Sequence, residues 1–171
     1  MISIQHGTIR TDAEAPSYFA TSSEANIAGS LFASLGYIIA YPDYIGYGTS
    51  NTIPHPYEHR SSLASASLDM IRASKEFVKE QNVGWDERLY IAGYSAGGFA
   101  TMSLQKKIEE ETGSEFNLKA SSCGAGAYDK TAFMKYLIGT KTGGTVSSNQ
   151  LYLWTMLTYD RLYGLNRTLS T

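Results

Sequence analysis

The chain has 171 residues, of which 43% are hydrophobic and 18% are charged, and its formal net charge is −2. This length supports one domain with a buried core, and the near-neutral charge gives no electrostatic basis for binding nucleic acid or an anionic membrane. The sequence has no apolar run long enough to form a transmembrane segment, and its first residues lack the basic and apolar stretches of a secretory signal.

The first part of the chain alternates between predicted strands and helices. Residues 1–5 form a short strand, and residues 37–41 form a continuously apolar strand of the kind that is buried on both faces of a sheet. Between them, residues 23–35 are predicted to be helical, because Thr21 and Glu24 resemble a capping box. The i, i+4, i+8 spacing predicts an inward apolar face on this helix made of Ile27, Leu31 and Leu35.

The middle of the chain continues the alternation. A loop with three prolines covers residues 42–56 and leads into a long helix over residues 58–81. Residues 88–92 form the next buried strand, a helix follows over residues 99–111, and the last strand covers residues 118–125. The long helix is predicted to pack inward through Leu63, Leu68, Met70, Ile71, Phe77 and Val78.

From Tyr128 onward the pattern becomes helical, aromatic and irregular, with a break rich in Gly, Ser and Thr at residues 139–148. Four strands that alternate with helices imply a mainly parallel sheet, covered on both faces and joined by right-handed crossovers. The sequence therefore predicts the α/β class, with a sheet core over residues 1–127 and a helical region over residues 128–171.

The most informative motif is Gly93-Tyr94-Ser95-Ala96-Gly97, a G-x-S-x-G sequence between a predicted strand and a predicted helix. A serine in this position occupies a tight turn that exposes its hydroxyl at the carboxyl end of a sheet. The free N–H groups and the dipole at the start of the helix favour negative charge there, as in an acyl-transfer oxyanion. The motif therefore predicts that Ser95 is the nucleophile of a serine hydrolase, and a glycine-rich structural turn is the less favoured interpretation.

Two backbone N–H groups are predicted to hold the oxyanion. In enzymes with this motif, one comes from the residue after the nucleophile, here Ala96, and the other from a loop after an early strand. The sequence His6-Gly7-Thr8 closes the first predicted strand and assigns the second N–H to Thr8. His6 is then expected to support the loop, although an ordinary turn at a strand end would also explain the motif.

The general base is harder to assign. His6, His55 and His59 all precede Ser95, and no histidine follows it in the sequence. The nucleophile needs a base that an acid orients, and with this motif the chain order is serine, acid, histidine. Either an early histidine acts in a non-standard order or the base is missing from this chain, and we expect none of the three to contact Ser95.

A metal site near these histidines is disfavoured. His55, Glu58 and His59 lie close together, but Pro56 opposes a shared helical face and no third ligand is evident. A role in the loop and at the start of the helix is the favoured interpretation. We expect no metal and no cofactor.

The loop over residues 43–50 carries the pattern D-x-x-G-x-G-x-S. It is not a nucleotide-binding sequence, because its glycine spacing differs and no helix begins directly behind it. Asp43 is expected to organise the loop through hydrogen bonds to backbone N–H groups. Tyr44 is expected either to line the site or to pack in the core.

These motifs occur in the order found in the α/β-hydrolase superfamily, which the chain resembles. Two stretches, Tyr41-Pro42-Asp43-Tyr44-Ile45-Gly46-Tyr47-Gly48 and His55-Pro56-Tyr57, are similar to the secretory lipase and esterase group, and residues 124–129 resemble the strand end that leads into its helical cap. The resemblance covers most of residues 1–130. It implies a three-layer α/β-hydrolase-type fold and a serine esterase or lipase that hydrolyses small-molecule carboxylic esters through an acyl-enzyme, and it suggests a secreted protein.

The sequence also departs from this family. The family's fold has strands before the one that ends at His6, and its acid and histidine follow the cap. The four predicted strands correspond to neighbouring strands of that sheet, with residues 37–41 and 118–125 outermost. We therefore expect a fragment of an enzyme about twice as long, inactive alone, whose sheet edges are covered by the rest of the same protein or by a second copy. In the cap, an acyl pocket is expected from Phe133, Tyr136, Leu137, Tyr152, Trp154 and Tyr159.

Two other functions stay open at this point. A prolyl-type aminopeptidase would use the same serine turn, and an acidic anchor for a substrate amine would favour it. A non-catalytic, hydrolase-like binding module would share the fold, and a Ser95 that does not react with a fluorophosphonate would favour that alternative.

Overall fold

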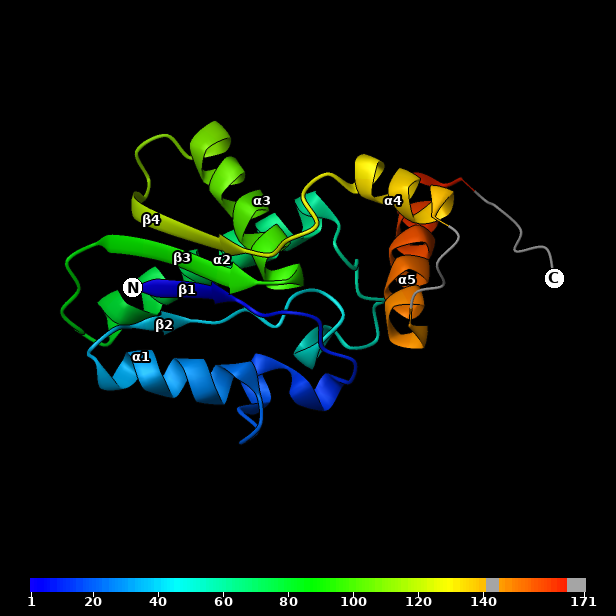
Figure 1. Ribbon diagram of the computed structural model, residues 1–171. Coiled ribbons are helices and arrows are strands. Elements are labelled where there is room, and N and C mark those ends of the chain that lie inside the picture. The colour runs from blue at the N-terminus through cyan, green and yellow to red at the C-terminus, as the bar shows by residue number, and fades with distance from the viewer. Residues whose placement is uncertain (141–144, 166–171) are drawn as a thin grey trace.

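The computed structural model describes residues 1–140 and 145–165. A parallel four-stranded sheet lies at its centre, with the strand order β2-β1-β3-β4 (Figure 1). The strands are β1 (Ile2–Gln5), β2 (Ile39–Ala40), β3 (Arg88–Tyr94) and β4 (Asn117–Gly124). The predicted α/β class, the parallel direction and the order with β2 and β4 outermost are confirmed.

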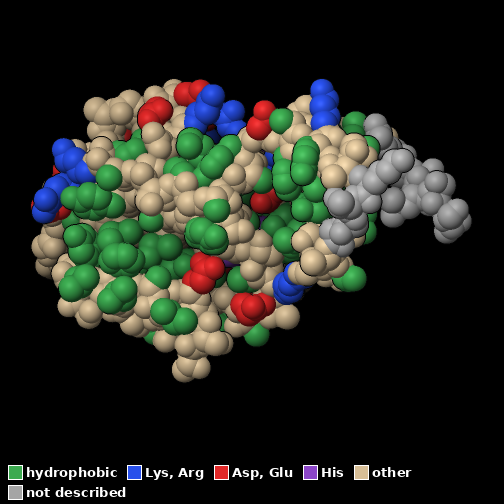
Figure 2. Space-filling model, viewed as in Figure 1, with side chains coloured by type: hydrophobic (Ala, Val, Ile, Leu, Met, Phe, Trp, Pro, Cys, Tyr) green, Lys and Arg blue, Asp and Glu red, His purple; other side chains and the backbone are tan. Residues whose placement is uncertain are grey.

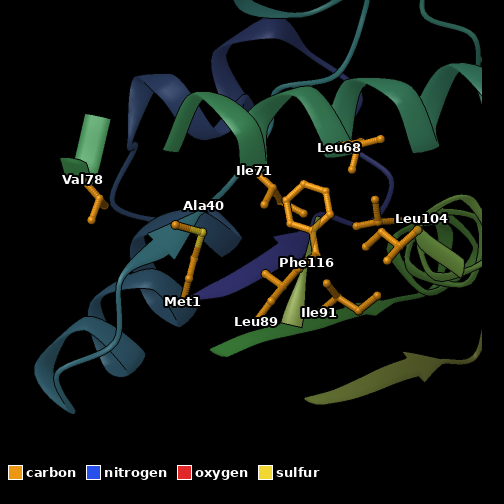
Figure 3. Packing of buried hydrophobic residues seen from close by; sticks show 10 residues of the cluster. Met1, Ala40, Leu68, Ile71, Val78, Leu89, Ile91, Leu104 and Phe116 are labelled. Atoms are coloured by element: carbon orange, nitrogen blue, oxygen red, sulfur yellow. The ribbon is translucent and has the colours of Figure 1, made fainter. Parts of the chain in front are cut away.

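Helices cover both faces of this sheet. The chain moves from β1 to β2 in one direction along the sheet and from β2 through β3 to β4 in the other. Because each crossover is right-handed, α1 (Ser30–Ser34) lies on the opposite face from α2 (Arg60–Glu80) and α3 (Ala96–Glu111) (Figure 1). The main hydrophobic core fills the space between the sheet and the α2–α3 pair (Figure 3); its buried members are Met1, Ala40, Leu68, Ile71, Val78, Leu89, Ile91, Leu104, Ile108 and Phe116.

Strand β2 is shorter than the predicted strand over residues 37–41. It pairs with β1 at two positions only, Ile2 with Ile39 and Ser3 with Ala40. Pro42 follows shortly after and has no N–H to continue a ladder. The continuous apolar run therefore marks the position of a strand without giving its length.

The helix predicted over residues 23–35 is the largest departure from expectation. The chain forms a π-helical turn at Ala25–Gly29 and then the short α1. Its small side chains turn toward the sheet, where they line a cavity of about 600 Å³ together with Ile39, Tyr41 and Met70. The predicted inward face points to solvent instead, with 63%, 58% and 66% exposure for Ile27, Leu31 and Leu35.

The predicted capping box at Thr21 and Glu24 is also wrong. One carboxylate oxygen of Glu24 accepts hydrogen bonds from the Gly7 N–H and from the Tyr41 hydroxyl, each at 3.1 Å. Glu24 therefore holds the loop after β1 rather than the start of its own helix. A capping box occurs earlier, where Thr11 and Glu14 close a 3-10 turn at Asp12–Glu14.

Helix α2 agrees closely with the predicted helix over residues 58–81. Leu63, Leu68, Ile71 and Val78 are buried as expected, but Phe77 is 62% exposed. Residues seven apart drift by about 20° per heptad around an α-helix. The series Leu63, Met70, Phe77 therefore leaves the buried face by its third member.

Helices α4 (Lys130–Gly139) and α5 (Val146–Tyr163) lie beyond the carboxyl ends of the strands (Figure 1). The predicted break over residues 139–148 is shorter than expected, because α5 begins at Val146, and residues 141–144 lie outside the described residues. Within the described ranges, no helix combines the length and hydropathy needed to cross a bilayer.

Candidate active site

Ser95 lies between the end of β3 and the start of α3, as the motif predicts. Its backbone has φ 58° and ψ −123°, a combination that is strained for a residue with a side chain. The turn is held on both sides, because the Ser95 N–H donates to the Gly124 carbonyl of β4 at 2.9 Å and the Ser95 carbonyl accepts from the Phe99 N–H at 3.1 Å. Ser95 is exposed at the carboxyl end of the sheet.

The glycines of the motif are explained by close backbone approach. A Cβ on Gly93 would lie 2.4 Å from the Gly97 carbonyl oxygen, and one on Gly97 would lie 2.0 Å from the Gln5 carbonyl oxygen. The first turn of α3 is therefore pressed against the end of β1. No larger residue fits at either position without movement of the backbone.

A cavity of about 210 Å³ opens beside Ser95, between the sheet core and the α4–α5 pair. Its core side is formed by the loop at Tyr57 and Glu58 and by the end of β4. The other side is formed by helix residues, and the remaining lining residues are Ala125, Ala127, Lys130, Phe133, Met134, Leu151, Tyr152 and Thr155. The nucleophile predicted from sequence thus faces a space that could hold a small molecule.

A partly buried ion pair lines this cavity and was not anticipated. The Lys130 ammonium of α4 donates to Glu58 Oε2, and the two side chains are only 18% and 12% exposed. Glu58 also has a positive φ of 49°, and its carbonyl accepts from the Tyr159 hydroxyl at 3.2 Å. The partners are 72 residues apart, so no local pattern could have paired them.

The two predicted oxyanion residues are close in space. Thr8 and Ala96 line a second, very small cavity of about 10 Å³, which shares Tyr57 and Glu58 with the cavity beside Ser95. The Thr8 hydroxyl is 2.7 Å from the Tyr57 hydroxyl. Within residues 1–140 and 145–165, neither the Thr8 N–H nor the Ala96 N–H donates to a protein acceptor.

His6 supports the loop that carries Thr8. Its Nδ1 lies 2.7 Å from the Gly7 carbonyl and its Nε2 3.2 Å from the Asp43 carbonyl. The Gly7 carbonyl and the Thr8 N–H belong to one planar peptide unit and point in opposite directions, so the contact with His6 also orients that N–H. Burial lowers the pKa of His6, and a neutral imidazole carries one N–H, so the neutral ring donates to one of these two carbonyls at a time.

The other two histidines also have structural contacts. His55 Nδ1 lies 2.7 Å from the Ile45 carbonyl, and the ring packs against Tyr47 and Trp154 with centroids 4.7 and 5.7 Å away. His59 caps α2 by accepting from the Ser62 N–H. Among the described residues, no hydrogen bond joins any of the three imidazoles to Ser95, and no group of three His, Cys, Asp or Glu could hold a metal.

Burial of His55 predicts a loss of stability in mild acid. Burial lowers the pKa of His55 from 6.5 to about 4. Between these pH values, the imidazole is therefore protonated in the unfolded chain and neutral in the folded chain. The free energy of unfolding should therefore be highest above pH 6.5 and fall as the pH drops toward 4. Urea unfolding across this range should give a smaller pH slope for His55→Gln than for the wild type, and equal slopes would contradict the prediction.

The 43–50 loop is built by packing and by long-range hydrogen bonds. Asp43 Oδ1 accepts from the Ser17 N–H at 2.8 Å, so it ties this loop to an earlier one instead of organising only its own backbone as expected. Gly48 is packed directly against the Asp43 carboxylate. Tyr44 is buried and packs on the His6 ring at 4.2 Å, which supports the packing role.

The aromatic side chains of the α4–α5 region divide into two groups. Of the predicted pocket residues, Phe133 and Tyr152 line the cavity beside Ser95. Trp154 instead stacks on Tyr57 with ring centroids 4.3 Å apart, and Tyr136 is 68% exposed. Helix packing and docking onto the core therefore account for part of the aromatic set.

The sheet order and the serine turn define an α/β-hydrolase-type fold. The sequence profile of the secretory lipase family matches residues 14–151. The chain therefore belongs to the secretory lipase family. The comparison with curated proteins gave no match.

Solved structures agree with this assignment. A protein from Legionella pneumophila, described as a hydrolase on provisional grounds, is 27% identical with a TM-score of 0.84, over 96% of this chain and 43% of that chain. The rice cell wall degrading esterase LipA from Xanthomonas oryzae is 26% identical with a TM-score of 0.76, over 99% of this chain and 45% of that chain. The chain thus spans less than half the length of either structure.

Proposed function

We propose that this chain is the nucleophile-bearing part of a serine esterase or lipase that hydrolyses carboxylic esters through an acyl-enzyme. The strained, exposed Ser95 at the β3–α3 junction carries the proposal, because the hydroxyl faces a cavity instead of the core. Membership of the secretory lipase family supports the same chemistry. The family name also supports a secreted location.

In the proposed reaction, Ser95 Oγ gives its proton to the general base and attacks the ester carbonyl, and the base returns the proton to the alcohol that leaves. Water, activated by the same base, then hydrolyses the acyl-enzyme to the acid and restores Ser95. The N–H groups of Ala96 and Thr8 hold the oxyanion, which their lack of acceptors among the described residues supports. The N-terminus of α3 adds positive potential at the same place. The strain in the serine turn is consistent with a nucleophile held ready for attack.

The general base and its acid are proposed to come from protein outside these 171 residues. His6 and His55 are engaged with backbone carbonyls, His59 caps α2, and no histidine follows Ser95. The matched structures are more than twice as long as the part that this chain covers, which leaves room for both residues. We further propose that residues 128–171 form part of a cap over the site.

The aminopeptidase alternative needs an acidic anchor for a substrate amine. Glu58 is an acid in the cavity beside Ser95, but Lys130 already compensates its charge. A protonated amine would have to compete with Lys130 for Glu58. This pairing favours an ester substrate over an aminopeptidase substrate.

A fluorophosphonate probe tests the proposed nucleophile directly. The full-length protein should be labelled once, and peptide mass spectrometry should place the label on Ser95. Ester hydrolysis should disappear in proportion to labelling. A folded, full-length protein that is not labelled would refute the proposal and favour a non-catalytic binding module.

We predict that the 171-residue chain expressed alone is inactive and self-associates. We expect it to be inactive because it would lack the general base. We expect it to self-associate because the outer strands β2 and β4 each leave one edge unpaired within the described sheet. Apolar side chains also gather on the face seen in Figure 2. Among the described residues, the exposed hydrophobic side chains include Ile27, Leu31 and Leu35. Light scattering after size exclusion should show oligomers, with the full-length protein as control. A stable monomer that hydrolyses esters at an ordinary enzymatic rate would contradict the prediction.

A further inference from the structure

The cavity beside Ser95 has two chemically different sides. Phe133, Met134 and Leu151 give it an apolar wall, whereas Glu58 and Lys130 place a charged pair at its border with the core. The ion pairs between residues 60 and 115 are surface pairs, in each of which at least one side chain is 44% or more exposed. The pair in the cavity is mostly withdrawn from solvent, where charges are costly unless they are well partnered.

The Lys130 ammonium makes two hydrogen bonds and one cation–π contact within the protein. It donates to Glu58 Oε2 and to the Ala127 carbonyl at 3.3 Å, and it lies 4.2 Å above the centroid of the Phe99 ring. Two of the three donors of the ammonium are therefore used by protein acceptors, and the cation–π contact further holds Lys130 against the core.

The carboxylate of Glu58 can accept further hydrogen bonds. Its Oε2 accepts one from Lys130, and its Oε1 accepts none from any residue within 1–140 and 145–165. A carboxylate can accept about four hydrogen bonds. Glu58 therefore presents an open acceptor at the edge of the cavity, which suits a hydrogen-bond donor on whatever occupies the cavity.

The charge of the pair decides which donor fits. Because Lys130 compensates Glu58, a protonated amine would gain little net attraction and would leave an excess positive charge in a partly buried site. A hydroxyl group donates one hydrogen bond without adding charge. The cavity therefore suits a neutral hydroxyl beside an apolar portion.

We propose that Glu58, with its charge compensated by Lys130, is a specificity-determining residue that accepts a hydrogen bond from a hydroxyl group of the ester substrate. The inference rests on the proposed function, because it places the scissile carbonyl at Ser95. The substrate class is a neutral ester that carries a hydroxyl on its alcohol or acyl part. The apolar remainder of the substrate lies against the wall formed by Phe133, Met134 and Leu151 of α4 and α5.

Two matched ester pairs test this selectivity with the full-length protein. Glyceryl monobutyrate against butyl butyrate places the hydroxyl on the alcohol, and ethyl 3-hydroxybutyrate against ethyl butyrate places it on the acyl part. In pH-stat assays, the hydroxylated ester of at least one pair should have a kcat/KM about tenfold or more above its partner, because a site built for a hydroxyl discriminates against analogues that lack it. Ratios near one in both pairs would overturn the inference, while labelling of Ser95 and ester hydrolysis would still support the proposed function.

Variants of Glu58 and Lys130 distinguish recognition of the substrate hydroxyl from a purely structural role of the ion pair. The neutral double variant Glu58→Met with Lys130→Met should bring the ratio of kcat/KM values toward one. The matched control, Arg72→Met with Glu115→Met, removes an exposed ion pair between distant segments and should keep the wild-type ratio. A double variant in the cavity that also keeps the wild-type ratio would overturn the inference.

A single variant tests the charge argument. Lys130→Gln leaves Glu58 uncompensated, so the amino analogue of whichever hydroxylated ester the wild type prefers (ethyl 3-aminobutyrate if the acyl pair discriminates) should gain several-fold in kcat/KM relative to that hydroxylated ester. A structural role alone would lower both rates and leave their ratio unchanged, and that outcome would count against Glu58 as the acceptor.

Discussion

Replacing Ser95 with alanine is expected to lower kcat for ester hydrolysis by the full-length protein by about four to six orders of magnitude. The reason is that the proposed acyl-enzyme could not form without the hydroxyl, whereas the proposed oxyanion hole and the cavity would remain. Hydrolysis of a p-nitrophenyl ester under saturating conditions measures the loss. Retention of most of this activity would refute the assignment of Ser95.

The stability of Ser95 variants provides a control for this experiment. Ser95→Ala keeps a Cβ in the strained conformation with φ 58° and should unfold at a temperature close to that of the wild type. Ser95→Gly should be equally inactive but more stable by about 1 kcal/mol or more, because glycine adopts positive φ without strain. A loss of activity that parallels a loss of folding would not fit a catalytic role.

The second large effect is expected at Gly97. Alanine is the better helix former by about 1 kcal/mol, so helix propensity alone predicts that Gly97→Ala stabilises α3. The added Cβ, however, would lie 2.0 Å from the Gln5 carbonyl oxygen, which is backbone of the adjacent strand. Overpacking against rigid backbone should outweigh propensity and destabilise the protein by about 3 kcal/mol.

Urea unfolding measures this change, and Gly84→Ala serves as the control. A Cβ at Gly84 meets no heavy atom within 4 Å, so its effect should stay within about 0.5 kcal/mol. Gly97→Ala should also reduce activity, because moving the first turn of α3 displaces Ser95 and the Ala96 N–H. A Gly97→Ala variant as stable and active as the wild type would show that α3 can move away from β1 freely.

The position of Ser95 at a strand-to-helix turn and the alternation of strands and helices could be predicted from the sequence, because both depend on local patterns. Ser95 is recognisable because a strand, a glycine-flanked serine and a helix are consecutive along the chain. The strand order followed from the family resemblance, and apolar runs located each strand. The register and exact length of β2 did not follow, because they depend on the pairing of Ile39 and Ala40 with β1.

Periodicity was misleading where two faces of a helix are both compatible with packing. Ile27, Leu31 and Leu35 form an apolar face by spacing, yet the chain turns its small residues Ala25 and Gly29 toward the sheet. These small side chains border the cavity of about 600 Å³ beside Ile39 and Tyr41, and the spacing along the chain does not say which face of the helix will lie toward the sheet.

The α/β class and the serine turn are encoded by residues that are neighbours in the chain, so both could be predicted before the structure was known. The surroundings of that serine depend instead on how distant segments pack. Glu58 and Lys130 meet across 72 residues, and His6 orients the Thr8 peptide only once Asp43 and Tyr44 have packed around its ring. Contacts of this kind depend on how the chain packs in three dimensions, and no spacing along the chain encodes them.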